Sequence, residues 1–242
     1  LMRYSNKYNA DVVEGGFRRF IGRVKLLSKN FSKEFAYIEQ PELFQKYFVS
    51  FFGISLLAVS LWGKLYRSEV FKRCNIGRTC FKMGEDMFLN MTIFPTLHNY
   101  LIISEVVYCY RWGGVTSHWK PEIIKESIAQ YKYRLELLRN LNYDRGVIPL
   151  QIEMVHLLIS ALRYAIRDGW TDEDMIKLIK DDNINHLLLE CTQSEQYNGD
   201  YYIAIQEIVH HRRDPQFLFD RLRSECKKDY LKSNVLKLLD LF

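Results

Sequence analysis

The sequence predicts an α/β fold followed by an all-helical region, so that helices dominate the chain overall. Two β-rich stretches, residues 10–15 and 100–111, lie in the first half and are separated by helical segments. After Trp119 the apolar residues follow helical spacing only. The composition is that of a folded protein, because 48% of the 242 residues are hydrophobic and only 12 are Gly and 5 are Pro. We expect one domain over residues 1–120 and a helical domain over residues 121–242.

The first domain begins with elements around a short buried strand. Residues 1–8 are predicted to end a helix, and residues 10–15 to form the strand, with Asp11 at its mouth. Residues 17–40 lack a clean period and indicate a strand or loop that crosses the sheet. Pro41 begins a helix, because the apolar residues that follow it keep i, i+3, i+4 spacing.

In the rest of this domain, predicted strands and short helices follow one another. Residues 56–66 are predicted to form a strand that carries Trp62, Lys64 and Tyr66. A short helix over residues 68–74 follows, with Ser68 as its cap. Gly84 leads into a helix over residues 86–92 that ends before Pro95. Residues 100–111 are then predicted to form two short strands or one bent strand.

The second domain consists of helices whose starts carry local signals. Pro121 begins the first helix, and Pro149 begins a second that is apolar around most of its circumference through residue 166 and should therefore be central. Thr171, followed by three acids, begins a third helix that ends near Lys180. Three more helices are predicted, over residues 201–209, 215–228 and 233–241.

An adjacent pair of acids, Glu85 and Asp86, follows Gly84 at the start of a predicted helix. The positive end of the helix dipole favours ionised carboxylates there, and an ionised carboxylate can accept a proton from an attacking hydroxyl. The alternative is that both acids simply cap the helix, because acids are common in first turns. The two side chains repel each other, so distinct roles are expected.

Three further motifs surround this pair in a characteristic order, and together they resemble the second half of family-2 glycosyltransferases of the GT-A fold. Residues 9–16 look like the segment that follows the metal-binding Asp-x-Asp motif of that family. The resemblance covers about residues 1–120 and implies a partial GT-A fold with a few strands. The acid pair belongs to the motif Gly84-Glu85-Asp86-x-x-x-Asn90. Besides residues 9–16, the surrounding motifs are Trp62-x-Lys64-Leu65-Tyr66-Arg67 and Tyr108-x-Tyr110-Arg111-x-Gly113-Gly114-x-Thr116.

The resemblance implies an inverting transfer of a sugar from a nucleotide-sugar donor to a saccharide or lipid-linked acceptor. Asp86 matches the position of the general base, and Glu85 would orient the acceptor or hold the loop. A divalent metal, Mg or Mn, is expected for the complete enzyme, but the Asp-x-Asp ligand motif is absent from its expected place in this chain, ahead of residues 9–16. We expect the nucleotide-binding half to lie outside these residues, and the 242 residues alone to be inactive.

Four other residues near these motifs are candidates for substrate or metal contacts. Trp62, Lys64 and Tyr66 would share one face of a strand and form an acceptor wall, although Trp62 can equally pack beneath the sheet. Arg111 can reach a phosphate or, alternatively, pair with Glu85 or Asp86. His118 is a metal or diphosphate contact in one interpretation and a surface residue in the other.

The charge and the cysteines limit the remaining function classes. A net charge of +5 without a reading motif argues against a nucleic-acid partner. The basic C-terminal helices indicate either a solvated face or contact with an anionic membrane surface. Five cysteines without Cys-x-x-Cys spacing are typical of free thiols in a reducing compartment, so we expect a cytoplasmic protein, including one bound to the cytoplasmic face of a membrane. The alternative function is a non-catalytic helical interaction or membrane-docking module.

Overall fold

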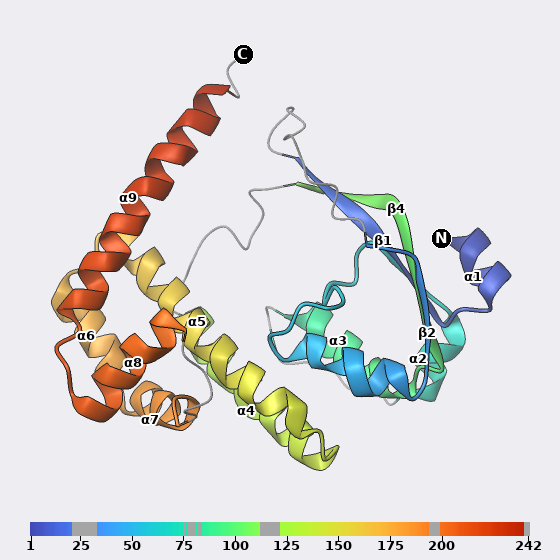
Figure 1. Cartoon of the computed structure of the whole chain (residues 1–242), viewed down its shortest axis with the longest axis horizontal. Coiled ribbons are helices and arrows are strands. Elements are labelled where there is room, and N and C mark those ends of the chain that lie inside the picture. Colours follow the sequence, from blue (N-terminus) through green and yellow to red (C-terminus); the bar gives the residue numbers. More distant parts are fainter. Residues whose placement is uncertain are drawn as a thin grey trace. The chain divides into compact units, whose positions relative to one another are not determined.

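The chain divides into two compact units, Leu1–His118 and Trp119–Phe242. The structure is a computed structural model, and it describes residues 1–20, 33–74, 76, 81, 84–111, 122–193 and 199–239. The first unit holds a small mixed sheet with short helices, and the second contains only helices among its described residues (Figure 1). The predicted fold class, an α/β part followed by a helical region, is confirmed.

The sheet of the first unit is built around two long strands that lie parallel to each other. β1 (Val12–Phe20) pairs in parallel with β4 (Asn99–Arg111). Two short strands, β2 (Ala36–Glu39) and β3 (Lys64–Tyr66), add antiparallel edges, which gives the order β2-β4-β1-β3. The central strand β1 thus has a neighbour on each side.

The two faces of the sheet are covered differently. On one face, α1 (Met2–Tyr8) packs Tyr4 and Tyr8 against a buried cluster of Ala10, Val13, Leu101 and Ile103. The other face carries alternate residues of the same strands, including Glu14 and Tyr100, and looks toward α3 (Glu85–Ile93). Because side chains alternate along a strand, this second face receives Lys64 and Tyr66 of β3 as well.

Phenylalanines fill the space between this second face and its helices. The segment after Pro41 forms a π-helical turn, η1 (Leu43–Tyr47), and a 3₁₀ turn, η2 (Phe48–Phe51). Phe48 is fully buried, with its ring centroid 5.3 Å from that of Phe52 and 5.8 Å from that of Phe94. The short helices α2 (Ser68–Arg73) and η3 (Phe94–Thr96) complete this layer.

Several predicted boundaries in the first unit were wrong. The strand expected over residues 56–66 is limited to β3, because the backbone of residues 56–61 bonds to side chains instead of a neighbouring strand. The strand expected over residues 10–15 continues to Phe20. For residues 100–111, the alternative of one strand is confirmed, since residues 99–111 form a single strand whose register is irregular opposite Glu14–Phe17. Ser68 does not cap α2, since Arg67 occupies the N-cap position, and its side chain makes no capping hydrogen bond to the helix.

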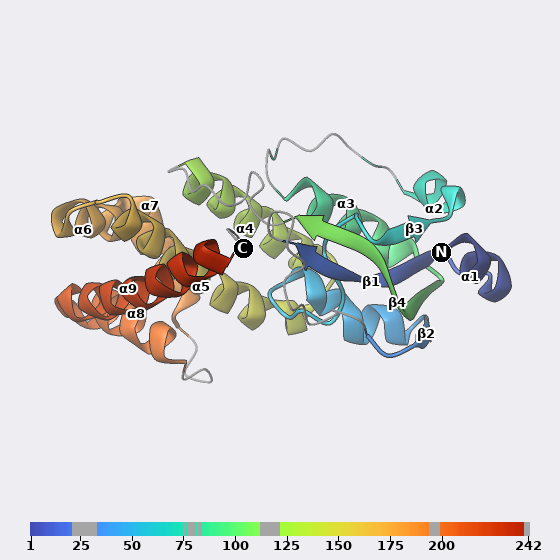
Figure 2. The same ribbon diagram turned by 90° about the horizontal axis from the view of Figure 1, so that it is seen from above.

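The second unit is organised around one apolar helix. α5 (Val147–Arg167) contacts α4 (Glu122–Asn140), α7 (Asp182–Cys191), α8 (Asp200–His211) and α9 (Gln216–Leu239), which Figure 2 shows from a second direction. The prediction that this helix is central is therefore confirmed. It is preceded by a 3₁₀ turn, η5 (Asp144–Gly146), and followed by α6 (Asp172–Lys180). Within the described chain, Asp144–Arg167 is long and apolar enough for a membrane span, a test that core helices of soluble proteins also pass.

The helices described in this unit differ from the predicted ones at three places. α7 was missed, because only Asp181 separates it from α6, and that residue caps α7 by accepting from Asn183 N (3.1 Å) and Ile184 N (3.3 Å). The two helices expected over residues 215–228 and 233–241 are the single helix α9. Pro149 is the third residue of α5 rather than its first.

Gly15 gives a first test of how closely β1 and β4 approach. A Cβ at this position would lie 2.5 Å from Val107 Cγ2 and 3.1 Å from Glu105 O, so Gly15→Ala should destabilise the protein by about 1–3 kcal/mol. Denaturant unfolding measures the change. The double variant Gly15→Ala/Val107→Ala should cost less than the sum of the two single substitutions, and strict additivity would contradict the proposed clash.

Thr171 gives a second test, at the start of α6. Its hydroxyl accepts from Asp174 N (3.2 Å) and the Asp174 carboxylate accepts from Thr171 N (3.1 Å), which completes a capping box. Thr171→Ala should lower the free energy of unfolding by about 1 kcal/mol. Thr171→Ser retains the hydroxyl and should cost much less, so equal losses in the two variants would count against the cap.

Candidate active site at the start of helix α3

Helix α3 begins with a glycine that turns the chain and two acids that follow it. Gly84 has a φ of 81°, a left-handed conformation that favours glycine, and its carbonyl accepts from Phe88 N (2.9 Å). Glu85 and Asp86 therefore occupy the first turn, where the helix dipole favours negative charge. Glu85 is exposed and Asp86 is half-buried, so the two side chains lie in different surroundings.

Among the described residues, one oxygen of Asp86 has a hydrogen-bond donor and the other has none. Leu61 N donates to Asp86 Oδ2 at 3.2 Å. Oδ1 makes no hydrogen bond to any residue in the part of the chain that the structure describes. The carboxylate is thus held in place while keeping an oxygen that can accept a further proton.

Asn90, one turn later on α3, connects the helix to the segment that leads to Leu61. Its side-chain amide donates to Val59 O (2.8 Å) and to Asp86 O (3.0 Å). Its carbonyl oxygen accepts from the hydroxyl of Tyr66 at 2.6 Å. Burial raises the pKa of Tyr66, which keeps this hydroxyl protonated at neutral pH and able to donate.

A buried ion pair lies against the backbone of residues 58–60. The side chains of Lys64 and Glu14 are 1% and 5% exposed, and their charged atoms are 3.8 Å apart. Lys64 Nζ donates to Ser60 O (2.7 Å) and to Ala58 O. Glu14 accepts from Ala58 N (3.3 Å), Tyr100 Oη (2.5 Å) and Lys33 Nζ (3.0 Å). Burial lowers the pKa of Lys64 to about 8, although the neighbouring Glu14 acts in the opposite direction.

These contacts converge on residues 56–63, which we call the site loop. Side chains bond its backbone at every residue from Leu56 to Leu61. They come from several segments: Lys33 reaches Leu56 O (2.6 Å) and Ser50 Oγ accepts from Leu57 N (3.0 Å). The loop therefore has a defined path although it forms no regular secondary structure before β3.

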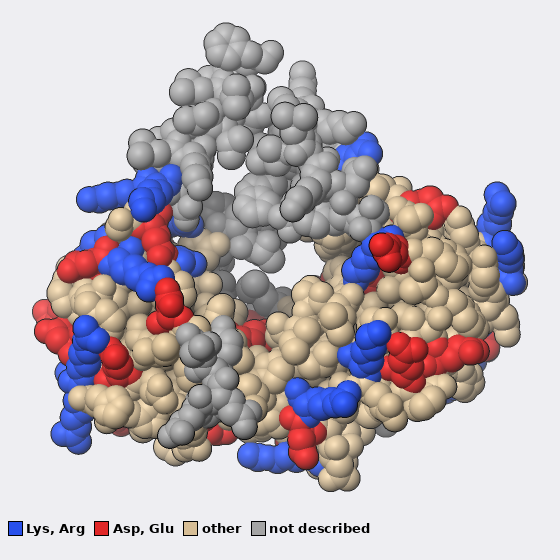
Figure 3. Space-filling view, in the orientation of Figure 1, with Lys and Arg blue, Asp and Glu red and all other residues tan. Residues whose placement is uncertain are grey.

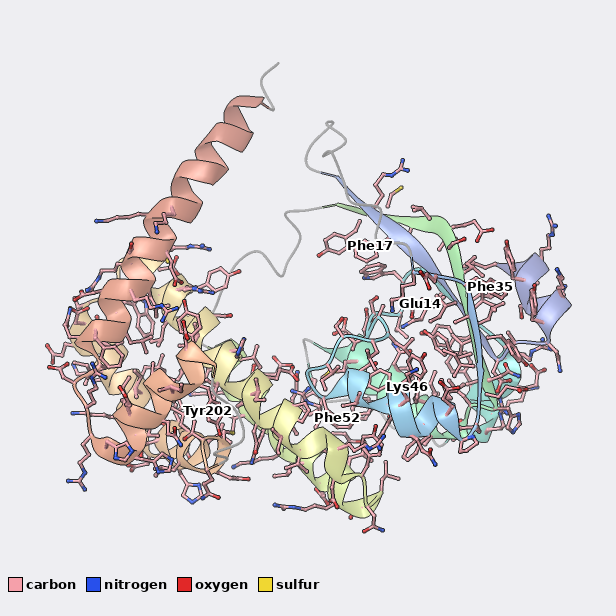
Figure 4. All side chains as sticks on the ribbon, viewed as in Figure 1. Glu14, Phe17, Phe35, Lys46, Phe52 and Tyr202 are labelled. Atoms are coloured by element: carbon pink, nitrogen blue, oxygen red, sulfur yellow. The ribbon has the colours of Figure 1, made fainter. Side chains whose placement is uncertain are left out.

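An aromatic cluster stands at the end of the site loop. Trp62 stacks on Tyr108 with ring centroids 4.7 Å apart and also contacts Tyr110 at 5.4 Å. Phe17 meets the edge of Trp62 at 4.8 Å. In Figure 4 the labelled side chains of Glu14 and Phe17 lie on the same side of β1. All four rings are half-buried, so part of the cluster faces outward.

The structure brings some of the predicted site residues together and leaves others apart. Asp86, Tyr66 and Lys64 all contact the site loop or the side chains that hold it. Trp62 precedes β3 and joins the aromatic cluster, so the expectation that one strand carries all three residues was wrong. Lys64 and Tyr66 do share one face of β3, with Lys64 pointing under the loop. Arg111 ends β4 with its side chain outside the described atoms, and His118 lies outside the described residues.

Glu14 and Asn90 are the residues whose part in this site sequence reasoning missed. A charged residue next to Val12 and Val13 in a buried strand is a signal that could have identified Glu14, because such a charge needs a partner. Asn90 was included in the motif Gly84-Glu85-Asp86-x-x-x-Asn90 without a role of its own, and its place four residues after Asp86, on the same side of α3, is the signal that could have supplied one.

The described residues contain no group of three or more His, Cys, Asp or Glu side chains that could hold a metal ion. The metal expected for the complete enzyme thus has no ligand set among them, and no chemical step of these residues is assigned to it.

Three of the basic residues near the C-terminus are paired with acids. Figure 3 shows Lys and Arg next to Asp and Glu on the surface of the helical unit. Pairing reduces the positive charge that is available to an anionic surface, and contact with a membrane stays a prediction. The pairs are Arg213–Glu207, Arg221–Asp200 and Arg223–Asp172.

Comparison with known proteins relates part of this chain to a glycosyltransferase. No protein-family model matches the chain. A segment of 93 residues, 37% of the chain, is 29% identical to Glycosyltransferase GlyA of Streptococcus pneumoniae serotype 4 (strain ATCC BAA-334 / TIGR4). The matched segment is 13% of the length of that relative.

The buried ion pair gives a prediction that depends on pH. We expect Lys64 Nζ to titrate near pH 8 in an NMR experiment, with Lys64→Met assigning the signal. The pKa of the exposed Lys46, raised by its hydrogen bond to Glu42, serves as the control. Because the unfolded chain binds more protons at Lys64 between about pH 8 and its ordinary value of 10.5, stability should rise with pH in that window, and Lys64→Met should abolish this rise. A midpoint near 10.5 would contradict the buried environment.

Proposed function

We propose that the first unit is the acceptor side of an inverting glycosyltransferase of family 2 with a GT-A fold, in which Asp86 is the general base. The donor is a nucleotide sugar and the acceptor is a saccharide or a lipid-linked saccharide. The observation that carries this proposal is the half-buried Asp86 carboxylate, held through Oδ2 by Leu61 N at 3.2 Å while Oδ1 is left to accept a proton. The similarity to a glycosyltransferase supports the reaction class.

The proposed step is a direct displacement at the anomeric carbon. The acceptor hydroxyl forms a bond to this carbon as its proton passes to Asp86 Oδ1. The bond from the anomeric carbon to the phosphate oxygen breaks, and its electron pair leaves with the nucleoside diphosphate. Attack and departure occur on opposite faces of the sugar, so the configuration inverts.

The surroundings of Asp86 support its use as a base. The N-terminus of α3 favours the carboxylate form, and Leu61 N fixes one oxygen so that the other keeps a constant direction. Trp62 follows Leu61 directly, and its half-buried cluster offers a surface on which a pyranose ring can stack. Tyr66 donates to Asn90 at 2.6 Å, and Asn90 in turn bonds the backbone of Val59 and of Asp86, so Tyr66 helps to hold α3 against the site loop.

The proposal assigns only the acceptor half of the reaction to these residues. The donor contact proposed for Arg111 and the metal or diphosphate contact proposed for His118 concern side chains outside the described atoms. When bound, a divalent metal would neutralise charge on the departing diphosphate.

The central test is Asp86→Asn in the longest natural polypeptide that contains these residues. The substitution keeps the size of the side chain but removes the proton acceptor, so kcat should fall at least about 100-fold. The Michaelis constant for the donor should change little. The measurement is release of nucleoside diphosphate from a panel of nucleotide sugars in the presence of saccharide acceptors.

The matched control is Glu69→Gln. Glu69 is also an acid in the first turn of a helix of the same unit, α2, but it is exposed, and its replacement should leave kcat near the wild-type value. Full turnover by Asp86→Asn would contradict the assignment of the base. Absence of turnover with every donor in the wild-type polypeptide would instead favour a non-catalytic helical interaction or membrane-docking module.

A further inference from the structure

The site loop is held by a pair of buried charges whose presence is not explained by stability alone. Replacing a buried ion pair with apolar side chains of similar size is often neutral or even stabilising, because desolvation opposes the attraction between the charges. Lys64 and Glu14 are nonetheless almost completely buried, with side chains 1% and 5% exposed. Their specific contribution therefore has to be sought in the groups that they contact.

Both charges bond the same residue of the loop. Glu14 accepts from Ala58 N at 3.3 Å, and Lys64 donates to Ala58 O. Lys64 donates in addition to Ser60 O at 2.7 Å, one residue before Leu61. The pair thus bonds three peptide groups of the loop, and the last of them, between Ser60 and Leu61, is the one whose N–H anchors Asp86.

The same pair is tied to the sheet of the first unit. Glu14 lies on the central strand β1, and Lys64 lies opposite it on β3. Tyr100 of β4 donates to Glu14 at 2.5 Å, and Gly15 N donates to Gly63 O at 2.9 Å. The loop is therefore held in place by residues of three strands, β1, β3 and β4, whereas Asp86 belongs to a helix.

We propose that Lys64 and Glu14 are positioning residues, which hold the site loop so that Leu61 N meets the Asp86 carboxylate in one geometry. This inference rests on the proposed function for its catalytic consequence, but the ordering of the loop is a property of the chain itself. Neither residue touches the reacting atoms. Their effect passes through Ala58 and Ser60 to Leu61, and from Leu61 N to Oδ2 of Asp86.

The test combines an exchange measurement with kinetics on Lys64→Met, which removes the donors and keeps the length of the side chain. In the 242-residue chain, amide hydrogen exchange at Ala58 and Leu61 should accelerate about tenfold, while exchange in α5 stays at the wild-type rate. In the longest natural polypeptide, kcat should fall at least about tenfold and the Michaelis constant for the donor should be preserved.

A core variant separates positioning from a general loss of stability. Ile103→Val trims a buried side chain on the opposite face of the sheet, where it packs with Leu101 and the α1 residues. It should lower the melting temperature without accelerating loop exchange or lowering kcat at temperatures where the protein is folded. Lys46→Met, which removes an exposed lysine, controls for the loss of one charge.

The outcomes distinguish this inference from the proposed function. Unchanged exchange at Ala58 and Leu61 in Lys64→Met overturns the inference whether or not the protein is active. Faster exchange with an unchanged kcat in an active enzyme overturns the positioning role. If the wild-type polypeptide shows no turnover, the proposed function fails and the positioning role fails with it, while the exchange rates still decide whether the pair orders the loop.

Discussion

The buried carboxylate of Glu14 is the interaction on which the order of the first unit depends. β1 has strands on both sides, so a charged side chain on its covered face cannot reach bulk water and needs partners inside the protein. Those partners are Tyr100 on β4, Lys64 on β3, Lys33 ahead of β2 and the backbone of Ala58. Compensating one charge therefore sets the relative positions of several segments that are distant along the chain.

The bonds that Glu14 and Lys64 make to the site loop also connect the sheet to the start of α3. The site loop receives bonds from the sheet through Glu14 and Lys64, and from the helix through Asn90 and Asp86. The loop is thus a hydrogen-bonded link between two elements that share few direct contacts of their own. A carboxylate that must accept a proton in a fixed direction benefits from such a link, since small displacements of a reacting group are costly in rate.

The helical unit is stabilised by different means. Its centre is the apolar helix α5, and its polar groups are mostly satisfied locally, by the caps of α6 and α7 and by ion pairs between neighbouring helices. Arg134, although only 2% exposed, is matched by Glu153 at 2.7 Å across the α4–α5 contact. Such a unit can be predicted well in outline, because apolar periodicity and caps are properties of short stretches of sequence.

The sequence by itself determined the fold class, the central place of α5, the capping box at Thr171 and the position of Glu85 and Asp86 in a first helical turn. Each of these depends on residues within a few positions of one another. Only the tertiary structure decided that β1 runs parallel to β4, that residues 56–63 are a loop and not a strand, and that Lys64 points inward to Glu14. These features depend on hydrogen bonds and charges contributed by residues far apart in the chain, which leave no periodic signal where they meet.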